Sequence, residues 1–158
     1  MIKIGDSLPQ HTFSLRQGGA MSNPETAELF TKKKVVLFAV PGAFTPTCSQ
    51  AHLPGFVVAA DQFKAKNVDS IICLSVNDAF VMEAWGEQAN AENITMLADG
   101  DGSFSEKIGL AKNTGAFGGV RATRFAMIVD NGVVSHLAIE EAGQFEISSA
   151  EAILEALK

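Results

Sequence analysis

Apolar residues along the chain follow two patterns, which together predict alternating strands and helices. Continuously apolar, β-branched runs over residues 35–40 and 68–76 predict strands that are buried on both faces. Between them, apolar residues recur at steps of three and four from position 53 to position 63, which predicts an amphipathic helix beginning near Cys48. These apolar residues are Leu53, Phe56, Val57, Ala60 and Phe63. A strand, a helix and a strand in this order predict a parallel pair with a right-handed crossover.

Two further helices are expected on either side of this unit. Asn23 suits an N-cap and Pro24 suits the first helical position, so a short helix is predicted to lead into the strand at residue 35. Asn77 and Asp78 offer a cap to a helix from residue 79 to about residue 91. Its predicted apolar stripe consists of Phe80, Val81, Ala84 and Trp85, and we expect Trp85 to serve packing.

The C-terminal part of the chain carries the clearest local signal. Residues 123–130 and 133–139 flank Asn131–Gly132, which predicts a β-hairpin with a type I′ turn. Ser148–Glu151 has the spacing of a capping box for a final helix. Shorter elements are expected as strands over 12–15 and 94–98 and as a helical turn over 104–108.

These elements predict a mixed sheet with helices on both faces. The thioredoxin-like layout is the small α/β fold that fits them best. With 158 residues and 47% hydrophobic content, the chain suits one well-packed core, so we expect a single domain over residues 1–158.

Composition and motifs argue against several classes of function. The net charge is −6 and only Lys32–Lys34 forms a basic run, so no nucleic-acid partner is expected. The chain has no apolar leader and no segment of membrane-spanning length, which predicts a cytoplasmic protein with no membrane partner. Its two cysteines and three histidines lack zinc-ligand spacing, so no metal is expected. The glycine-rich residues 113–120 lack the ending of a phosphate-binding loop.

Cys48 is the leading candidate for chemistry. A helix N-terminus favours the thiolate through its free N–H groups and its dipole. Thr45 can direct a hydroxyl at the sulfur or at a substrate oxygen, and Pro41 and Pro46 stiffen the intervening loop. On these grounds alone, Cys48 could equally be a small buried hydrophobic residue.

Residues 41–56, PGAFTPTCSQAHLPGF, decide between these alternatives because they resemble the peroxiredoxins. The resemblance is strongest to the type-five branch, which includes bacterial members linked to glutaredoxin and glutathione. It extends through CLSVNDAFVMEAWG, MLAD, RATRFAMIVDNGVV and SSAEAIL. It implies a thiol-dependent peroxidase, an oxidoreductase of antioxidant defence that reduces hydrogen peroxide and small alkyl hydroperoxides.

The resemblance also assigns roles to individual residues. Cys48 is the implied peroxidatic nucleophile, and Thr45 and Pro41 complete its loop with Gly42 and Thr47 in support. The implied positive charge comes from Arg124 at the start of an apolar strand. A guanidinium suits this role because it stays charged and presents several N–H donors in one plane. The donors expected to stabilise the leaving oxygen are Arg124, the Thr45 hydroxyl and the Cys48 N–H.

Two neighbouring residues compete for parts of this site. Arg121 is a second candidate for the cation, and we expect it to lie behind Arg124 or on the surface. His52 lies four residues after Cys48 on the same helical face, where it could serve as a base. We expect it instead to have a hydrogen-bonded structural role.

The expected product is a sulfenic acid, which a second thiol must reduce. Cys73 lies within a run that is apolar on both sides and is predicted to be a buried structural thiol. Where some relatives have a resolving cysteine, this chain has Ile147. The hypothesis is therefore a one-cysteine cycle in which glutathione, glutaredoxin or another external thiol attacks the oxidised Cys48, without a cofactor. The resemblance further suggests a homodimer, with Phe44, Pro46 and either Trp85 or Phe117 across the interface.

Three other functions use the same residues differently. A dithiol oxidoreductase would need Cys-x-x-Cys, but Ala51 occupies the fourth position. A Cys-His hydrolase would use His52 as its base, and a redox sensor would signal through oxidised Cys48 without turnover.

Overall fold

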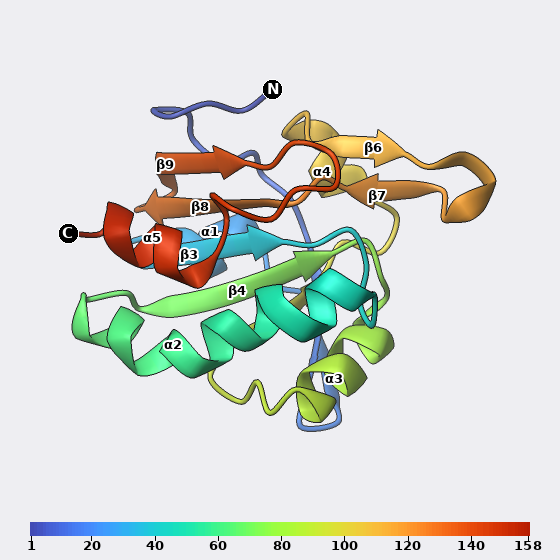
Figure 1. Ribbon diagram of the computed structural model, residues 1–158, viewed down its shortest axis with the longest axis horizontal. Helices are drawn as coiled ribbons and strands as arrows, with labels where there is room; N and C mark the ends of the chain where they lie inside the picture. The colour runs from blue at the N-terminus through green and yellow to red at the C-terminus, as the bar shows by residue number, and fades with distance from the viewer.

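A mixed seven-stranded sheet runs through the protein, as seen in the computed structural model, which describes residues 1–158 (Figure 1). The strand order is β2-β1-β5-β4-β3-β8-β9. The strands are β1 Ser14–Gln17, β2 Ala20–Ser22, β3 Lys34–Ala39, β4 Ser70–Ser75, β5 Thr95–Ala98, β8 Phe125–Asp130 and β9 Val133–Ile139. The predicted parallel unit is confirmed, since β3 and β4 pair in parallel around the helix that joins them. The expected thioredoxin-like α/β fold is thus the observed one.

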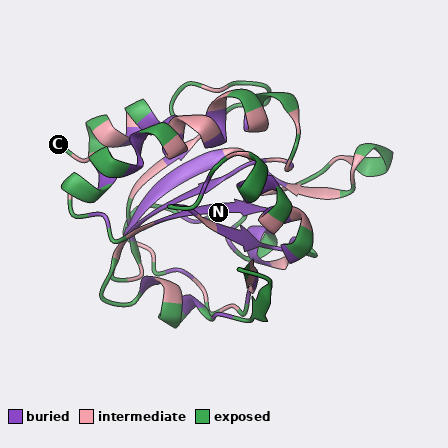
Figure 2. Ribbon diagram, turned by 90° about the horizontal axis from the view of Figure 1, so that it is seen from below, coloured by how far each residue is buried: buried purple, intermediate pink, exposed green.

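Helices cover both faces of this sheet, which explains why its central strands are apolar throughout. The helices are α1 Thr26–Phe30, α2 Leu53–Ala65, α3 Ala79–Gln88, α4 Ser103–Lys107 and α5 Ala150–Ala156. Val36 and Phe38 of β3 join a core cluster with α2, α3 and α5, and the alternate residues Val35 and Leu37 join a second cluster with α1 and α4. Figure 2 shows the central strands as the most continuously buried part of the molecule, in agreement with the burial of β3, β4 and β8. None of the helices combines the length and apolar character needed to cross a bilayer.

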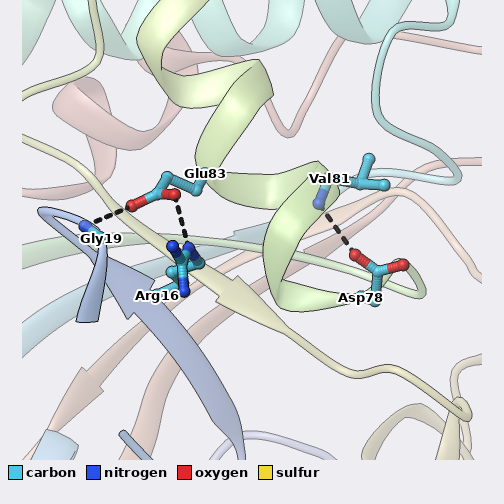
Figure 3. A network of polar contacts seen from close by, with 5 residues as sticks. All are labelled: Arg16, Gly19, Asp78, Val81 and Glu83. Atoms are coloured by element: carbon cyan, nitrogen blue, oxygen red, sulfur yellow. Dashed lines mark hydrogen bonds and ion pairs between the residues drawn. The ribbon is translucent and has the colours of Figure 1, made fainter. Parts of the chain in front are cut away.

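Helix α3 buries a different face from the predicted one. Its buried residues are Ala79, Met82, Trp85 and Gly86, whereas Phe80 is 60% exposed. The predicted start is confirmed, because the Asp78 carboxylate accepts a hydrogen bond from the Val81 N–H and caps the helix at Ala79 (Figure 3). Phe80 instead lies beneath the Arg16 guanidinium, whose Cζ atom is 4.9 Å from the centre of the Phe80 ring.

One ion pair joins the β1–β2 hairpin to α3. The Glu83 carboxylate accepts hydrogen bonds from Arg16 Nε at 2.9 Å and from the Gly19 N–H at 3.1 Å (Figure 3). The sequence pattern predicted only one strand here, over residues 12–15. The second strand was missed because it is short and exposed, and its turn depends on the positive φ of Gly18 and Gly19.

Two predicted helix caps are wrong by one or two residues. Glu25, not Asn23, caps α1 in a reciprocal pair with Glu28. The preceding stretch is extended because Phe13 N–H bonds to the Pro24 carbonyl, so Pro24 cannot begin the helix. Ser149 caps α5 through the Ala152 N–H.

The C-terminal half of the chain contains two antiparallel hairpins. The predicted β8–β9 hairpin is confirmed, with positive φ at both Asn131 and Gly132 as a type I′ turn requires. The glycine-rich stretch forms a second, unpredicted hairpin of β6 Ala111–Asn113 and β7 Val120–Ala122, with the 3₁₀ turn η2 Gly115–Phe117 between them. This arm projects from the body of the molecule (Figure 1).

Candidate active site

Cys48 lies where the loop after β3 enters a helix. The chain turns at Pro41 and Gly42, becomes helical at Pro46, and passes through the π-helical turn η1 Cys48–His52 into α2. The Cys48 side chain is only 1% exposed, and both cysteines of the chain are free thiols.

The π-helical turn was not predicted, although Pro54 offers a reason for it. A proline has no N–H, so Pro54 cannot donate to the carbonyl four residues earlier, and its ring crowds that carbonyl. The Leu53 N–H instead reaches the Cys48 carbonyl across five residues. Cys48 and His52, four residues apart in this turn, both contact Arg124.

The start of this helix leaves donors free beside the sulfur. The Ser49 N–H bonds to the Thr45 carbonyl at 2.9 Å, but the N–H groups of Thr47 and Cys48 donate no hydrogen bond within the chain. Such groups carry the positive end of the helix dipole. They therefore favour negative charge at the thiol and on an oxygen bound next to it.

Arg124 brings a full positive charge to the same place. It lies between β7 and β8, and its Nη2 is 3.0 Å from Cys48 Sγ although the residues are 76 positions apart. No carboxylate lies within ion-pair distance of Arg124, whose guanidinium carbon is 5.7 Å from the Phe145 ring centre. Its charge is thus available to a thiolate.

His52 holds the other side of this guanidinium. Its Nδ1 lies 2.7 Å from Arg124 Nη1, and its Nε2 lies 2.9 Å from the Ser148 carbonyl. Burial, with a smaller contribution from Arg124, lowers the pKa of His52 to about 3. The neutral ring therefore donates from Nε2 to Ser148 and accepts from Arg124 at Nδ1. Neither nitrogen bonds to Cys48, so the Cys-His hydrolase has no base here.

The loop before Cys48 is fixed by hydrogen bonds from three directions. Thr45 Oγ1 donates to the Gly42 carbonyl at 2.7 Å, so its hydroxyl proton is not directed at the sulfur and its lone pairs stay free. The Ala43 N–H donates to Asn77 Oδ1 at the end of β4. Arg121 Nη1 donates to the Pro41 carbonyl at 3.0 Å. Arg121, the competing arginine, thus supports the loop without contacting the thiol.

Trp85 lies beneath the first turn of the helix. Its Nε1 donates to Ser49 Oγ at 3.0 Å, and its ring is 1% exposed. Of the aromatic residues suggested for an interface, Phe44 is 49% and Phe117 is 85% exposed, so Trp85 alone is already buried within its own chain.

Sequence reasoning missed the role of Glu140. Its carboxylate accepts hydrogen bonds from the Glu146 N–H and from both the N–H and hydroxyl of Ser148. Burial opposes ionisation, but these hydrogen bonds outweigh it and keep the pKa of Glu140 below its usual value. The ionised Glu140 thereby holds the segment whose Ser148 carbonyl binds His52. No local pattern signals these contacts.

The second thiol is shielded from this chemistry. Cys73 is fully buried in β4, and burial raises its pKa well above the ordinary value. A protonated thiol in this position is a poor nucleophile.

A hollow of about 240 Å³ opens next to Arg124. Four segments meet around it: the loop before Cys48, the base of the β6–β7 arm, the approach to β8 and the loop after β9. Its lining residues are Pro41, Thr47, Lys112, Thr123, Arg124, Glu140, Glu141, Ala142, Gly143 and Gln144.

Comparisons with known proteins agree with this site. The chain matches the family model described as Redoxin over residues 3–154. It is 46% identical to the chloroplastic peroxiredoxin-2E of Arabidopsis thaliana, covering 99% of this chain and 69% of that protein. It is 45% identical to the hybrid peroxiredoxin hyPrx5 of Haemophilus influenzae, covering 97% of this chain and 65% of that protein. The structure of reduced Prx3 from Vibrio vulnificus in complex with H₂O₂ superposes with a TM-score of 0.98 at 59% identity, covering both chains completely. The chain belongs to the peroxiredoxin family of thiol-dependent peroxidases, which serve in antioxidant defence.

Proposed function

We propose that Cys48 is the peroxidatic residue and that it reduces hydrogen peroxide and small alkyl hydroperoxides. Its thiolate attacks one oxygen of the peroxide, forming an S–O bond as the O–O bond breaks. The other oxygen leaves with the electron pair and takes a proton to become water or an alcohol. Cys48 is oxidised to the sulfenic acid, and the peroxide is reduced by two electrons.

The observation that carries this proposal is the Arg124 guanidinium, which has no carboxylate partner and whose Nη2 lies 3.0 Å from Cys48 Sγ. In a site shielded from water, a fixed cation stabilises both the attacking thiolate and the charge that develops on the leaving oxygen. The free Cys48 N–H adds a second donor on the helix side.

The residues of the loop before Cys48 orient the peroxide and hold the site in shape. Because the Thr45 hydroxyl donates to Gly42, its oxygen is free to accept a hydrogen bond from the peroxide O–H and to align the O–O bond. The Pro41 carbonyl accepts a hydrogen bond from Arg121. Gly42 lies against the same guanidinium, and a side chain at position 42 would collide with it. Thr47 supplies a free N–H at the mouth of the site.

The oxidised thiol is restored by an external reductant, with glutathione and glutaredoxin favoured over thioredoxin. Cys73 is buried and protonated, and Ile147, half exposed near the start of α5, offers no thiol. The identity to hyPrx5 of Haemophilus influenzae supports placement in the type-five branch. Glutathione attack on the sulfenic acid releases water and leaves a mixed disulfide, which glutaredoxin or a second glutathione cleaves.

Three wider features belong to the same proposal. Residues 1–158 form one peroxiredoxin domain, and the protein acts in the cytoplasm. Two copies form a homodimer in which the exposed Phe44 and Phe117 become buried, Trp85 being engaged within its own chain. Sedimentation of a monomer at micromolar concentration would contradict the dimer.

The direct test is a peroxidase assay on purified protein. Stopped-flow mixing with hydrogen peroxide should give one sulfenic acid per chain, and Cys48→Ser should abolish it while Cys73→Ser retains it. NADPH-coupled assays then compare glutathione plus glutaredoxin with thioredoxin. Oxidation without turnover by any thiol would favour a sensor, and a preference for thioredoxin would refute the proposed reductant.

A further inference from the structure

The hollow beside Arg124 carries two charges that the protein does not use. Lys112 at its rim is exposed and forms no ion pair or hydrogen bond through its side chain. Glu141 on the opposite loop is also exposed, and its carboxylate has no partner. The other charged groups of the lining are committed, because Glu140 accepts from Ser148 and Glu146, and Arg124 binds Cys48 and His52.

The hollow also adjoins the residues around the sulfur, since Arg124, which contacts Cys48 Sγ, is part of its lining. Thr47 and Pro41 line it, and both belong to the loop that leads to the buried Cys48. Its volume of about 240 Å³ is below the roughly 300–1,000 Å³ of pockets that enclose a drug-sized ligand. It therefore suits one end of a short peptide better than a whole large substrate.

We propose that this hollow is the docking site for the small reducing thiol, a short zwitterionic peptide of the glutathione class. Lys112 binds a carboxylate of the peptide and Glu141 binds its ammonium, while the thiol reaches Cys48 past Thr47. The inference rests on the proposed function, since it requires a small external thiol as reductant.

The β6–β7 arm gains a role from this assignment. Lys112 stands at the base of the arm, paired in register with Arg121, which also holds the Pro41 carbonyl. The same hairpin thus supports the Cys48 loop and presents a cation to the incoming thiol.

The chemical step balances without a further co-reactant. The peptide sulfur attacks the sulfenic sulfur of Cys48, so an S–S bond forms as the S–O bond breaks. The hydroxide that leaves takes the proton of the attacking thiol and departs as water. The docked peptide remains bound as the mixed disulfide.

The test compares a charged with an uncharged thiol on the same oxidised protein. Cys48 is converted to the sulfenic acid with one equivalent of hydrogen peroxide, and its decay is followed with glutathione or with 2-mercaptoethanol. The variants are Lys112→Glu and the matched control Lys64→Glu, which makes the same charge change on the exposed side of α2. We expect Lys112→Glu to slow reduction by glutathione about tenfold, as expected for reversal of a charge that steers and holds a ligand. Reduction by 2-mercaptoethanol should change less than about twofold, since that thiol carries no charge for Lys112 to meet.

The two levels of the proposal fail differently. Equal slowing of the glutathione reaction by Lys112→Glu and Lys64→Glu would refute the docking site and leave the reductant intact. So would equal slowing of glutathione and 2-mercaptoethanol by Lys112→Glu. A wild-type protein that thioredoxin reduces and glutathione does not would refute the reductant, and the docking site with it.

Discussion

The buried His52 makes the folded protein sensitive to acid in a way that can be calculated. Its pKa is about 3 in the folded protein, against 6.5 for an exposed histidine. Since the unfolded chain binds the proton more readily, the stabilising contribution is fully present above pH 6.5 and is lost as the pH falls toward 3. The whole difference corresponds to about 5 kcal/mol, at about 1.4 kcal/mol for each unit of pKa. At pH 5 about 2 kcal/mol of stability should be gone relative to pH 8.

Urea unfolding at a series of pH values measures this loss, with the single buried Trp85 as the fluorescent probe. The informative variant is His52→Asn, which retains an acceptor for Arg124 but cannot titrate. Glu140, whose lowered pKa also removes stability in acid, contributes to both proteins and cancels in the comparison. The variant will be less stable at every pH because it leaves a void, so the pH dependence is the readout. His136→Asn on β9 is the matched control, since that ring makes no hydrogen bond.

The expected result is a curve for His52→Asn that is flatter than the wild-type curve by about 2 kcal/mol between pH 8 and pH 5. The His136 control should keep the wild-type slope. Equal slopes for His52→Asn and wild type would refute the reasoning. A His52 ring resonance that titrates near pH 6.5 in NMR spectra of the folded protein would refute it independently.

Three other predictions, made with four substitutions, test the site itself. Arg124→Gln should slow peroxide attack by about 100- to 1,000-fold in stopped-flow assays, the effect of removing a donor at developing charge. Arg121→Gln should slow the same reaction by less than about tenfold, because the Arg121 donors reach only backbone carbonyls. Equal effects of the two variants would contradict the assignment of Arg124. Gly42→Ala should place a methyl against Arg121 and break its bond to the loop, lowering the free energy of unfolding by about 1–2 kcal/mol in denaturant titration; an unchanged midpoint would show that the loop yields. Cys73→Ala should retain full turnover with glutathione, and loss of turnover in a folded variant would give Cys73 a redox role.

A structural feature could be predicted from the sequence when the residues that determine it are close together along the chain. The buried run before Pro41, the proline and glycine that end it and the three- and four-residue apolar steps after Cys48 all lie within one stretch of chain. They predicted the strand, the turn and a cysteine at a helix start, and each was found. The Asn131–Gly132 hairpin was equally local, since the turn type follows from those two residues. Arg124 was suggested only by family resemblance, because nothing near residue 124 points to residue 48.

The tertiary structure decided how these parts act together. The sequence alone determined a thiol at the positive end of a helix, within an α/β sheet of thioredoxin-like layout. Only the folded chain places an unpaired Arg124 on that thiol and braces it with His52, whose partner Ser148 lies 96 residues further along. Glu140 and Arg121 tie down the surrounding segments in the same way. Such contacts depend on side-chain directions from segments that meet only after the sheet has formed, whereas sequence periodicity reports only which face of an element is buried.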